Sequence, residues 1–197
     1  MDVYKEKIQS DGILDKLKLR IEVRGDLQNK ELVGDTWPPT ASMSNLKYFL
    51  ADATKYKAKV HQLYFIGTLL QAKVKNRVFF KLDIRYTYCF PEYAEYFGRA
   101  LILLKSMYGM TNSGKLFADE LTEWLLEAGF IQSQFLMPIY YKYAPDGSKI
   151  VVLSYDDDCV YWYTNEDIGK RFVDTLRNLF HVNFLKYAYW FMSIRIS

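Results

Sequence analysis

Short segments in which hydrophobic and polar residues alternate, or in which hydrophobic residues run together, recur along the whole chain. Leu19, Ile21 and Val23 alternate with charged residues as far as Gly25, which predicts a half-buried strand over 18–24. The same reasoning predicts strands at 60–65, 78–82, 139–143, 149–154, 159–163, 181–185 and 189–196. Pro145-Asp146-Gly147 is a turn signal, so the strands on its two sides are expected to form a β-hairpin.

Apolar residues at helical spacing predict three helices. The first runs from an N-cap at Ser44 to about residue 57, and the second from Ser113 to Gly129. The third begins with a capping box of Thr164 and Asp167. The expected buried faces contain, in chain order, Leu46, Phe49, Leu50, Ala53, Phe117, Leu121, Trp124, Leu125, Ala128, Ile168, Phe172, Leu176 and Leu179. This mixture predicts an α+β fold around a largely antiparallel sheet.

Composition narrows the class of protein. With 197 residues, of which 50% are hydrophobic, the chain has the composition of a globular domain. A net charge of +3 and an aromatic share of 17% fit a nucleic-acid partner without requiring one. Cys89 and Cys159 form no C-x-x-C pair and are expected to be reduced packing residues. A charged N-terminus, and apolar runs far shorter than about 18 residues, predict a soluble intracellular protein of the cytoplasm or nucleus with no membrane contact.

Three consecutive carboxylates, Asp156, Asp157 and Asp158, stand where two apolar strands meet. Neighbouring carboxylates repel one another, and a divalent cation such as Mg²⁺ removes that cost because it prefers carboxylate oxygens. Two such ions about 3.5–4 Å apart can activate a 3′-hydroxyl and stabilise a departing pyrophosphate. The alternative is a solvated turn, since aspartate favours turn geometry by itself. The apolar sequence on both sides favours a turn held in a cleft.

Cations gather on one face of the first predicted strand. Lys18, Arg20 and Arg24 share that face with a single anion, Glu22. Such a cluster could bind phosphates. A solvated strand face is the alternative interpretation.

Tyr155-Asp156-Asp157-Asp158 fits the Y-x-D-D hairpin of reverse transcriptases, and other segments match in the same order. As a set, over about residues 17–197, they resemble the reverse transcriptases of copia-type retrotransposons. The matching segments, each with the family's pattern, are 18–25 (K-A-R-L-V-A-R-G), 35–39 (D-T-F-A-P), 60–65 (Q-L-D-V), 104–110 (K-S-L-Y-G-L) and 189–194 (Y-F-L-G-I).

This resemblance implies templated DNA synthesis by two-metal nucleotidyl transfer with Mg²⁺. It also implies fingers, at about 13–58 and 75–107, and a palm, at about 59–74 and 108–197, whose largely antiparallel sheet is backed by helices. A thumb and a ribonuclease H domain are expected to be absent. The implied partners are an RNA or DNA template with its primer, deoxynucleotide triphosphates, and the remainder of the retrotransposon polyprotein.

The resemblance also implies roles for individual residues. Asp157 and Asp158 would be the metal-binding acidic pair. The nucleotide-binding residues would be Lys18, Arg20, Arg24, Leu69, Tyr108 and Gly109. Gly109 would let the backbone approach the nascent base pair. The primer side would be formed by Phe191, Met192 and Ser193.

The most consequential departure from the family is at the first catalytic aspartate, whose place is taken by Tyr64. A phenol is neutral at pH 7 and cannot replace a bidentate carboxylate between two cations. Asp83 also follows a strand-like run, but it lies too near Tyr108 in sequence for the family's spacing. We therefore interpret Asp83 as a polar loop residue.

Further departures point in the same direction. Asp156 adds charge where the family usually has an apolar residue, and Leu69 replaces the aromatic that screens out the ribose 2′-hydroxyl. Ser193 and Lys186 stand where glycines are usual. Together these changes predict an impaired polymerase.

Two other functions stay open on the sequence alone. One is a catalytically inactive relic that still binds nucleic acid. The other is a metal-dependent phosphohydrolase that uses the acidic turn. The second would need a further set of ligands, and the two histidines, His61 and His181, lie in segments expected to pack in the core.

Overall fold

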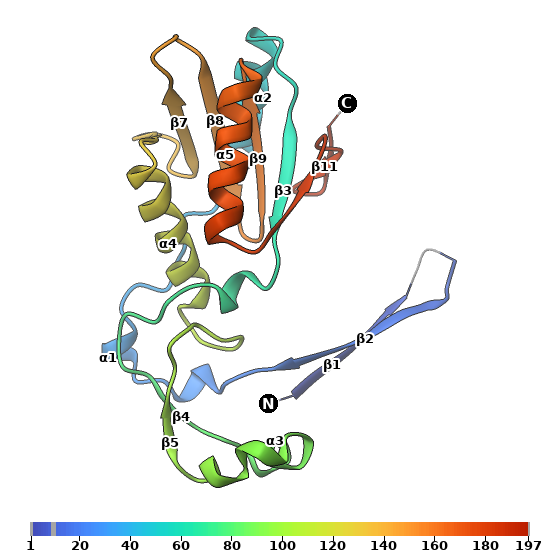
Figure 1. Ribbon diagram of the computed structural model, residues 1–197, viewed down its shortest axis with the longest axis vertical. Coiled ribbons are helices and arrows are strands. Elements are labelled where there is room, and N and C mark those ends of the chain that lie inside the picture. Colours follow the sequence, from blue (N-terminus) through green and yellow to red (C-terminus); the bar gives the residue numbers. More distant parts are fainter. Residues whose placement is uncertain (1, 9–10, 197) are drawn as a thin grey trace.

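The computed structural model describes residues 2–8 and 11–196. Its centre is a six-stranded antiparallel sheet with the strand order β10-β3-β9-β8-β7-β6 (Figure 1). The strands are β3 (His61–Phe65), β6 (Ile131–Gln132), β7 (Ile139–Tyr143), β8 (Lys149–Tyr155), β9 (Asp158–Tyr163) and β10 (Val182–Leu185). The predicted α+β class with antiparallel sheet is thereby confirmed.

Helices cover both faces of this sheet. Helices α4 (Ser113–Glu127) and α5 (Glu166–Leu179) pack on one face, and α2 (Met43–Lys55) packs on the other (Figure 1). Two hydrophobic cores result: the first lies between the sheet and helices α4 and α5, and the second lies between the sheet and α2. Val152 of β8 packs with Phe172 in the first core, whereas its neighbour Val151 packs with Phe49 in the second. Successive residues of a strand point to opposite faces, so β8 is buried on both sides and reads as a continuous apolar run.

The helices start at different residues from those predicted. The N-cap of α2 is Ser42, whose Oγ accepts a hydrogen bond from the Asn45 backbone N–H at 3.2 Å. Asn165 caps α5, and Thr164 accepts from the Lys149 N–H at 2.8 Å instead. Short polar residues cluster before both helices, and each can bond to a nearby backbone group, so sequence alone does not select the capping residue.

Two further helix predictions need correction. Ser113 is the first residue of α4, not its cap, and its Oγ donates to the Met110 carbonyl at 3.1 Å. Leu179, expected to be buried, is 60% exposed, whereas the next residue, Phe180, is buried. The chain leaves the helix at Phe180, and the ring of that residue takes the core position.

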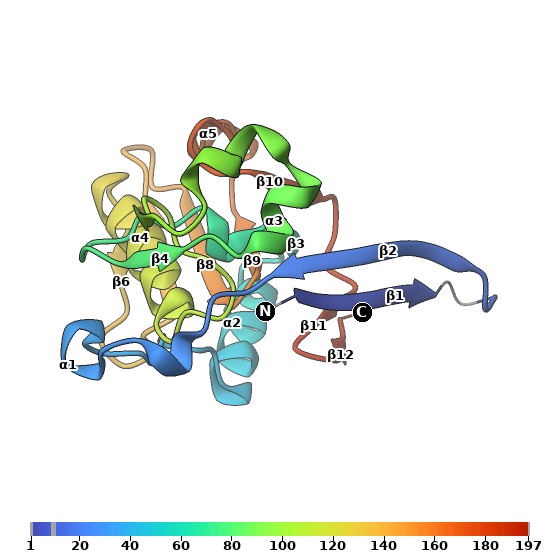
Figure 2. The same ribbon diagram turned by 90° about the horizontal axis from the view of Figure 1, so that it is seen from below.

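The remaining elements lie outside the central sheet. They are β1 (Asp2–Ile8), β2 (Leu14–Ile21), η1 (Gly25–Leu27), α1 (Lys30–Val33), η2 (Thr68–Leu70), β4 (Phe79–Lys81), α3 (Ile84–Cys89), η3 (Pro91–Tyr96), β5 (Ala100–Ile102), β11 (Trp190–Phe191) and β12 (Ile194–Arg195). β1 and β2 form a hairpin that projects from the body of the molecule (Figures 1 and 2). Helix α2, which the predicted division assigns to the fingers, packs on the central sheet. The division into fingers and palm stays a prediction.

The first predicted strand is shifted and more exposed than expected. It is β2, which ends at Ile21, and Leu17 and Ile21 are 73% and 38% exposed. Among the described residues β2 pairs with β1 alone, and Figure 2 shows the far end of this hairpin extending away from the other elements. Val23, beyond the end of the strand, packs against the first core. The expected strand over 18–24 is therefore wrong in its bounds. Of its predicted buried residues, Val23 packs against the core, Ile21 is exposed, and the side chain of Leu19 lies outside the described residues.

The predicted strand at 189–196 is instead a tight hairpin of β11 and β12. Met192 and Ser193 connect the two strands, and both have positive φ, 50° and 61°. Two-residue hairpin turns of this kind favour glycine or asparagine, because a side chain at positive φ crowds the backbone. The sequence gives no such signal, which is why the turn was not predicted.

Replacing Ser193 with glycine is expected to raise the free energy of unfolding by about 0.5–1 kcal/mol, since glycine adopts positive φ without strain. Urea unfolding would measure the change. Ser44→Gly, in the exposed part of α2, is the matched control and should destabilise by a similar amount. A loss of stability in Ser193→Gly would contradict a strained turn.

Two sequence predictions concern the cysteines and membranes. Cys159 is a free thiol in the first core, and burial raises its pKa to about 12, as expected of a packing residue. The side chain of Cys89 lies outside the described residues. Within residues 2–8 and 11–196, no helix combines the length and apolarity needed to span a bilayer.

Candidate catalytic turn

The acidic turn joins β8 to β9 at the end of two buried strands. Tyr155 and Asp158 are the last paired residues, and Asp156 and Asp157 form the connection. The carbonyl of Asp157 accepts a hydrogen bond from the Phe65 backbone N–H at 2.8 Å, which ties the turn to β3. Asp156 has φ of 48°, a conformation that aspartate and asparagine tolerate better than most residues. The turn is therefore held by the β8–β9 pairing at its base and by one backbone hydrogen bond to β3.

The carboxylates of the turn are crowded. Burial raises the pKa of Asp158, and the neighbouring charges of Asp157 and Asp156 raise it further. Gln62 Nε2 donates to Asp158 Oδ1 at 3.5 Å and acts in the opposite direction. Burial and the charge of Asp157 also raise the pKa of Asp156. The turn thus concentrates negative charge that nearby donors compensate only weakly.

Asp156→Asn should stabilise the protein at neutral pH by about 0.5 kcal/mol, a small value because Asp156 is only partly shielded from solvent, which screens its charge. With its pKa raised by folding, Asp156 holds its proton more tightly when folded, so stability falls as pH rises through that pKa. The gain should therefore vanish below about pH 4, where both states are protonated. Thermal unfolding at neutral pH and below about pH 4, with Asp174→Asn as the control, would measure the change in stability. An equal gain in stability at the two pH values would contradict charge repulsion as its cause.

Tyr64 lies directly beside this turn. It pairs with Asp158 of β9 on one side and with Asn183 of β10 on the other. Side chains of directly paired residues share one face of a sheet, so the phenol lies next to the carboxylate. Its hydroxyl accepts a hydrogen bond from Asn183 Nδ2 at 2.6 Å, and the side chain is half exposed. The position that the resemblance gives to the first catalytic aspartate thus holds a ring anchored to β10.

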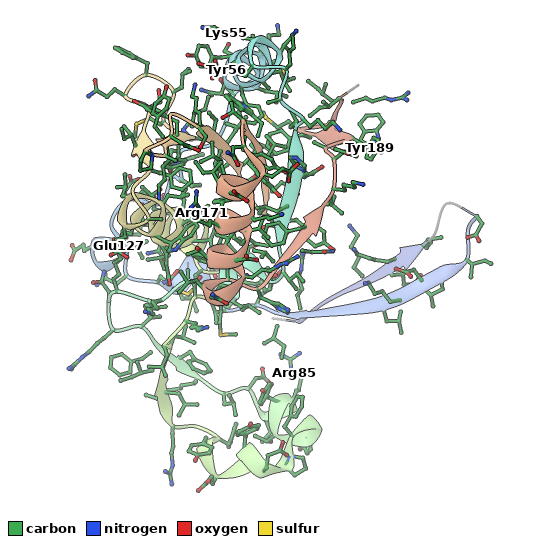
Figure 3. All side chains as sticks on the ribbon, turned by 45° about the horizontal axis from the view of Figure 1, so that its top comes forward. Lys55, Tyr56, Arg85, Glu127, Arg171 and Tyr189 are labelled. Atoms are coloured by element: carbon green, nitrogen blue, oxygen red, sulfur yellow. The ribbon has the colours of Figure 1, made fainter. Side chains whose placement is uncertain are left out.

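Asp83 is engaged elsewhere. It caps α3 and accepts hydrogen bonds from the Arg85 backbone N–H at 2.9 Å and from Arg85 Nη2 at 2.8 Å. The Arg85 guanidinium and these hydrogen bonds hold the pKa of Asp83 far below its usual range. Figure 3 shows Arg85 beside α3, away from the central sheet. Both carboxylate oxygens of Asp83 are therefore used within α3, and its side chain has a structural role.

The donor set of the turn does not match a paired-metal centre. Among residues 2–8 and 11–196, no three His, Cys, Asp or Glu side chains come together as a group that could hold a metal ion. Tyr64 would contribute a neutral phenol, already bound to Asn183, where a bridging carboxylate is needed. The residues present therefore do not fit two Mg²⁺ ions.

Three of the predicted nucleotide-binding residues, Arg20, Tyr108 and Gly109, lie where two segments cross. The Arg20 guanidinium lies over the Tyr108 ring, 5.0 Å from its centroid, and its buried Nε has no hydrogen-bond partner in the described part of the chain. Arg24 forms two hydrogen bonds with Asp26, at 2.8 and 2.6 Å. The side chain of Lys18 lies outside the described residues. Leu69 lies in η2 and is partly exposed.

Gly109 is where these segments cross. The Tyr108 carbonyl accepts from the Val23 N–H at 2.8 Å, and a Cβ on Gly109 would lie 2.2 Å from the Val23 carbonyl oxygen. Gly25 makes the reciprocal approach, with a Cβ position only 2.0 Å from the Gly109 carbonyl oxygen. The close approach made by Gly109 is thus to the segment after β2, a contact that sequence reasoning missed.

A cavity of about 1270 Å³ borders the segment that follows β2. Val23, Phe80, Leu103 and Lys115 are among its lining residues, whereas the residues of the acidic turn are not. The cavity is thus separate from the acidic turn.

The strands on either side of the turn supply two residues that the sequence did not single out. Gln62 bonds to Asp158, and Asn183 bonds to Tyr64. Neither belongs to a recognisable motif. Only the order β10-β3-β9 brings them to the turn, and that order joins segments about a hundred residues apart.

Comparison with known proteins agrees with the motif series. Residues 1–197 match the model of the family described as reverse transcriptase (RNA-dependent DNA polymerase). The chain is 23% identical over 193 residues to a retrovirus-related Pol polyprotein from transposon RE2 of Arabidopsis thaliana, which covers 98% of this chain and 13% of that protein. The chain thus spans only about an eighth of that relative, and no solved structure matches. The chain belongs to the reverse transcriptase family, which confirms the resemblance drawn from its motifs.

Proposed function

We propose that this chain is the reverse transcriptase domain of a copia-type retrotransposon polyprotein, and that nucleotidyl transfer is impaired because Tyr64 stands in place of the first catalytic aspartate. The observation that supports this most directly is the pairing of Tyr64 with Asp158. A carboxylate at that position would face Asp158 across two neighbouring strands. The phenol fills the same space and offers no charge.

In the family's reaction, the primer 3′-hydroxyl attacks the α-phosphorus of a deoxynucleotide triphosphate and pyrophosphate leaves. Divalent ions such as Mg²⁺, if bound, would supply activation of the attacking hydroxyl and charge neutralisation at the leaving group. Asp157 and Asp158 are the residues of this chain that would contact such ions. With Tyr64 beside them, the residues of this chain do not complete such a metal site.

The chain's other residues are proposed to bind the substrates. Arg20, whose guanidinium lies over the Tyr108 ring, would contact a phosphate oxygen. The β11–β12 turn at Met192 and Ser193 would contact the primer. The expected partners are an RNA or DNA template with primer, deoxynucleotide triphosphates and the rest of the polyprotein.

A second candidate function is nucleic-acid binding without chemistry. The hydrogen bond between Asn183 and Tyr64 favours it, because the ring is integrated into the sheet as a structural residue. A phosphohydrolase has less support. The His61 ring stacks against Tyr161 and Tyr163, with centroids 5.3 and 4.9 Å away, at the end of β3 that is farther from the acidic turn.

The test is single-nucleotide extension of a labelled primer on a template, together with binding of the same duplex. We expect salt-dependent binding, and extension at least about 10³-fold slower than that of a related domain with aspartate at this position. Fast extension would contradict the impairment but not the family function. Failure to bind the duplex would contradict both candidates.

A further inference from the structure

One lysine of the central sheet is surrounded by aromatic rings. The ammonium group of Lys149, the first residue of β8, lies 5.1 Å from the centroid of the Trp162 ring in β9 and 5.8 Å from that of Tyr143 in β7. Tyr56, the C-cap of α2, provides a third ring at 5.0 Å. We call these three rings, together with the carboxylate of Asp52, the ammonium cage.

The cage forms where two neighbours of β8 and the end of α2 meet. Tyr143 is directly opposite Lys149 in the β7–β8 pairing, so the two side chains share one face of the sheet. Trp162 is diagonal to Lys149 on the other neighbouring strand, β9, and stands on the same face. Helix α2 packs on that face and brings Asp52 and Tyr56, which are four residues apart and so lie on one side of the helix.

The electrostatics of the cage favour a cation. Asp52 accepts a hydrogen bond from Lys149 Nζ at 2.9 Å. The two side chains are only 17% and 12% exposed, so solvent screens their charges weakly. The C-terminal end of α2 adds the partial negative charge of its last carbonyls. The cage therefore holds a positive charge in surroundings from which most water is excluded.

The cage is wider than an unmodified ammonium group needs. A methyl carbon lies about 1.5 Å from the nitrogen that carries it. Methyl groups on a nitrogen at this position, if they point at the rings, would lie about 3.5–4.3 Å from the ring centres, which is van der Waals contact. A quaternary ammonium group would thus fill space that the Lys149 ammonium leaves open.

The cage also has a side that solvent reaches. Tyr56 and Tyr143 are 42% and 54% exposed, and Figure 3 shows Tyr56 at the end of α2, near the edge of the molecule. Lys149 stands at the very start of β8, next to the exposed turn of residues 145–147. Its long side chain can therefore turn outward and leave the cage open to a ligand.

We propose that the ammonium cage binds a quaternary ammonium group, with Lys149 as the internal occupant that the ligand displaces. Aromatic cages are suited to this class of ligand, which includes trimethylated lysine side chains and small quaternary amines. The displaced Lys149 ammonium is strongly hydrated and gains water when it turns outward, while Asp52 stays paired with the ligand. This site goes beyond the proposed function, because it needs neither nucleotide nor nucleic acid. Figure 1 shows the β7–β8 turn and the acidic turn at opposite ends of β8.

The experiment measures the affinity for tetramethylammonium chloride from the rise in Tm, with equal concentrations of sodium chloride as the reference. Lys149→Ala removes the internal occupant and should bind tetramethylammonium at least about tenfold more tightly than the unmodified chain, in which Lys149 competes for the cage. Adding Tyr143→Leu to Lys149→Ala removes one exposed wall and should lower that affinity about threefold or more. Lys142→Ala is the matched control, because the Lys142 ammonium lies over the single ring of Phe130, and it should respond like the unmodified chain.

A second variant covers the case in which Lys149→Ala does not fold because Asp52 has lost its partner. Lys149→Ala with Asp52→Asn removes both charges, keeps the three rings and should still bind tetramethylammonium more tightly than the unmodified chain. A peptide with one trimethyllysine, compared with its unmethylated form, then identifies the source of the ligand. Preference for the trimethyllysine peptide over tetramethylammonium would indicate a protein ligand, and the reverse preference a small amine.

Two results would overturn the proposal. One is a rise in Tm with tetramethylammonium that is no larger in the folded Lys149 variants than in Lys142→Ala or in the unmodified chain. The other is an equal response with and without the Tyr143 ring, which would indicate a general effect of the salt on the folded protein.

Discussion

Tyr64→Asp is expected to raise the rate of single-nucleotide primer extension by about 10³-fold or more, because it returns a carboxylate to the place opposite Asp158. The substitution removes the hydrogen bond to Asn183, but Tyr64 is half exposed, so little packing is lost. Without metal, the new carboxylate would repel Asp158 and lower stability slightly. With metal present, the two carboxylates would hold the ion, which would remove their mutual repulsion.

A second measurement separates metal binding from activity. Mg²⁺ at about 100 times its Kd would stabilise the Tyr64→Asp variant by about 2.7 kcal/mol, visible as a rise in Tm. The unmodified chain should show a much smaller rise. Tyr48→Asp, an exposed substitution on α2, is the matched control for added charge and should give neither effect. A Mg²⁺-dependent rise without extension would point to the substrate-binding surfaces as the limit.

The backbone of the acidic turn limits which residues can replace Asp156 in a variant that regains metal binding. An apolar β-branched residue at position 156, though closer to the family's pattern, would be strained at φ of 48°. Asp156→Asn removes the extra charge and tolerates that backbone. The combination of Tyr64→Asp with Asp156→Asn should therefore extend primers at least as well as Tyr64→Asp alone.

Gly109→Ala should lower the free energy of unfolding by about 3 kcal/mol or more. Its φ of 87° disfavours any side chain by about 1 kcal/mol, and the added Cβ would lie 2.2 Å from the Val23 carbonyl oxygen. That neighbour is backbone and is held by the hydrogen bond to Tyr108, so it cannot move away cheaply. Urea unfolding is the measurement.

Gly147→Ala is the control for backbone strain alone. Gly147 has φ of 81°, and nothing lies within 4 Å of its Cβ position, so about 1 kcal/mol is expected. Gly25→Ala tests the collision alone, because its φ is not positive and its Cβ would lie 2.0 Å from the Gly109 carbonyl oxygen. Equal losses in Gly147→Ala and Gly109→Ala would show that the crossing is less tight than the structure indicates.

Local sequence was enough to predict the elements whose burial is decided within one segment. The β7–β8 hairpin followed from its apolar run and its Pro-Asp-Gly turn, and the buried face of α2 followed from its helical spacing. Elements whose environment depends on distant segments were predicted less well. β2 has the alternation of a half-buried strand, yet only β1 pairs with it, so Leu17 is exposed.

The candidate site shows the same limit. The three aspartates could be recognised by their sequence alone, and Tyr64 by the position that the resemblance gives it. Gln62 and Asn183 could not, because their contacts with the site come from the register of β3 with β9 and of β10 with β3. That register depends on the packing of the whole sheet, so the sequence around Gln62 and Asn183 does not indicate it.

The alternation of β3 has a consequence for how such a copy decays. Leu63 and Phe65 point into the core, whereas Tyr64 lies between them on the more open side. Aspartate and tyrosine codons differ by one base, so a single mutation exchanges the two residues at this position without touching the apolar core on the other face of β3. Under the proposed function, such a product would stay folded and would still occupy the templates that active copies use.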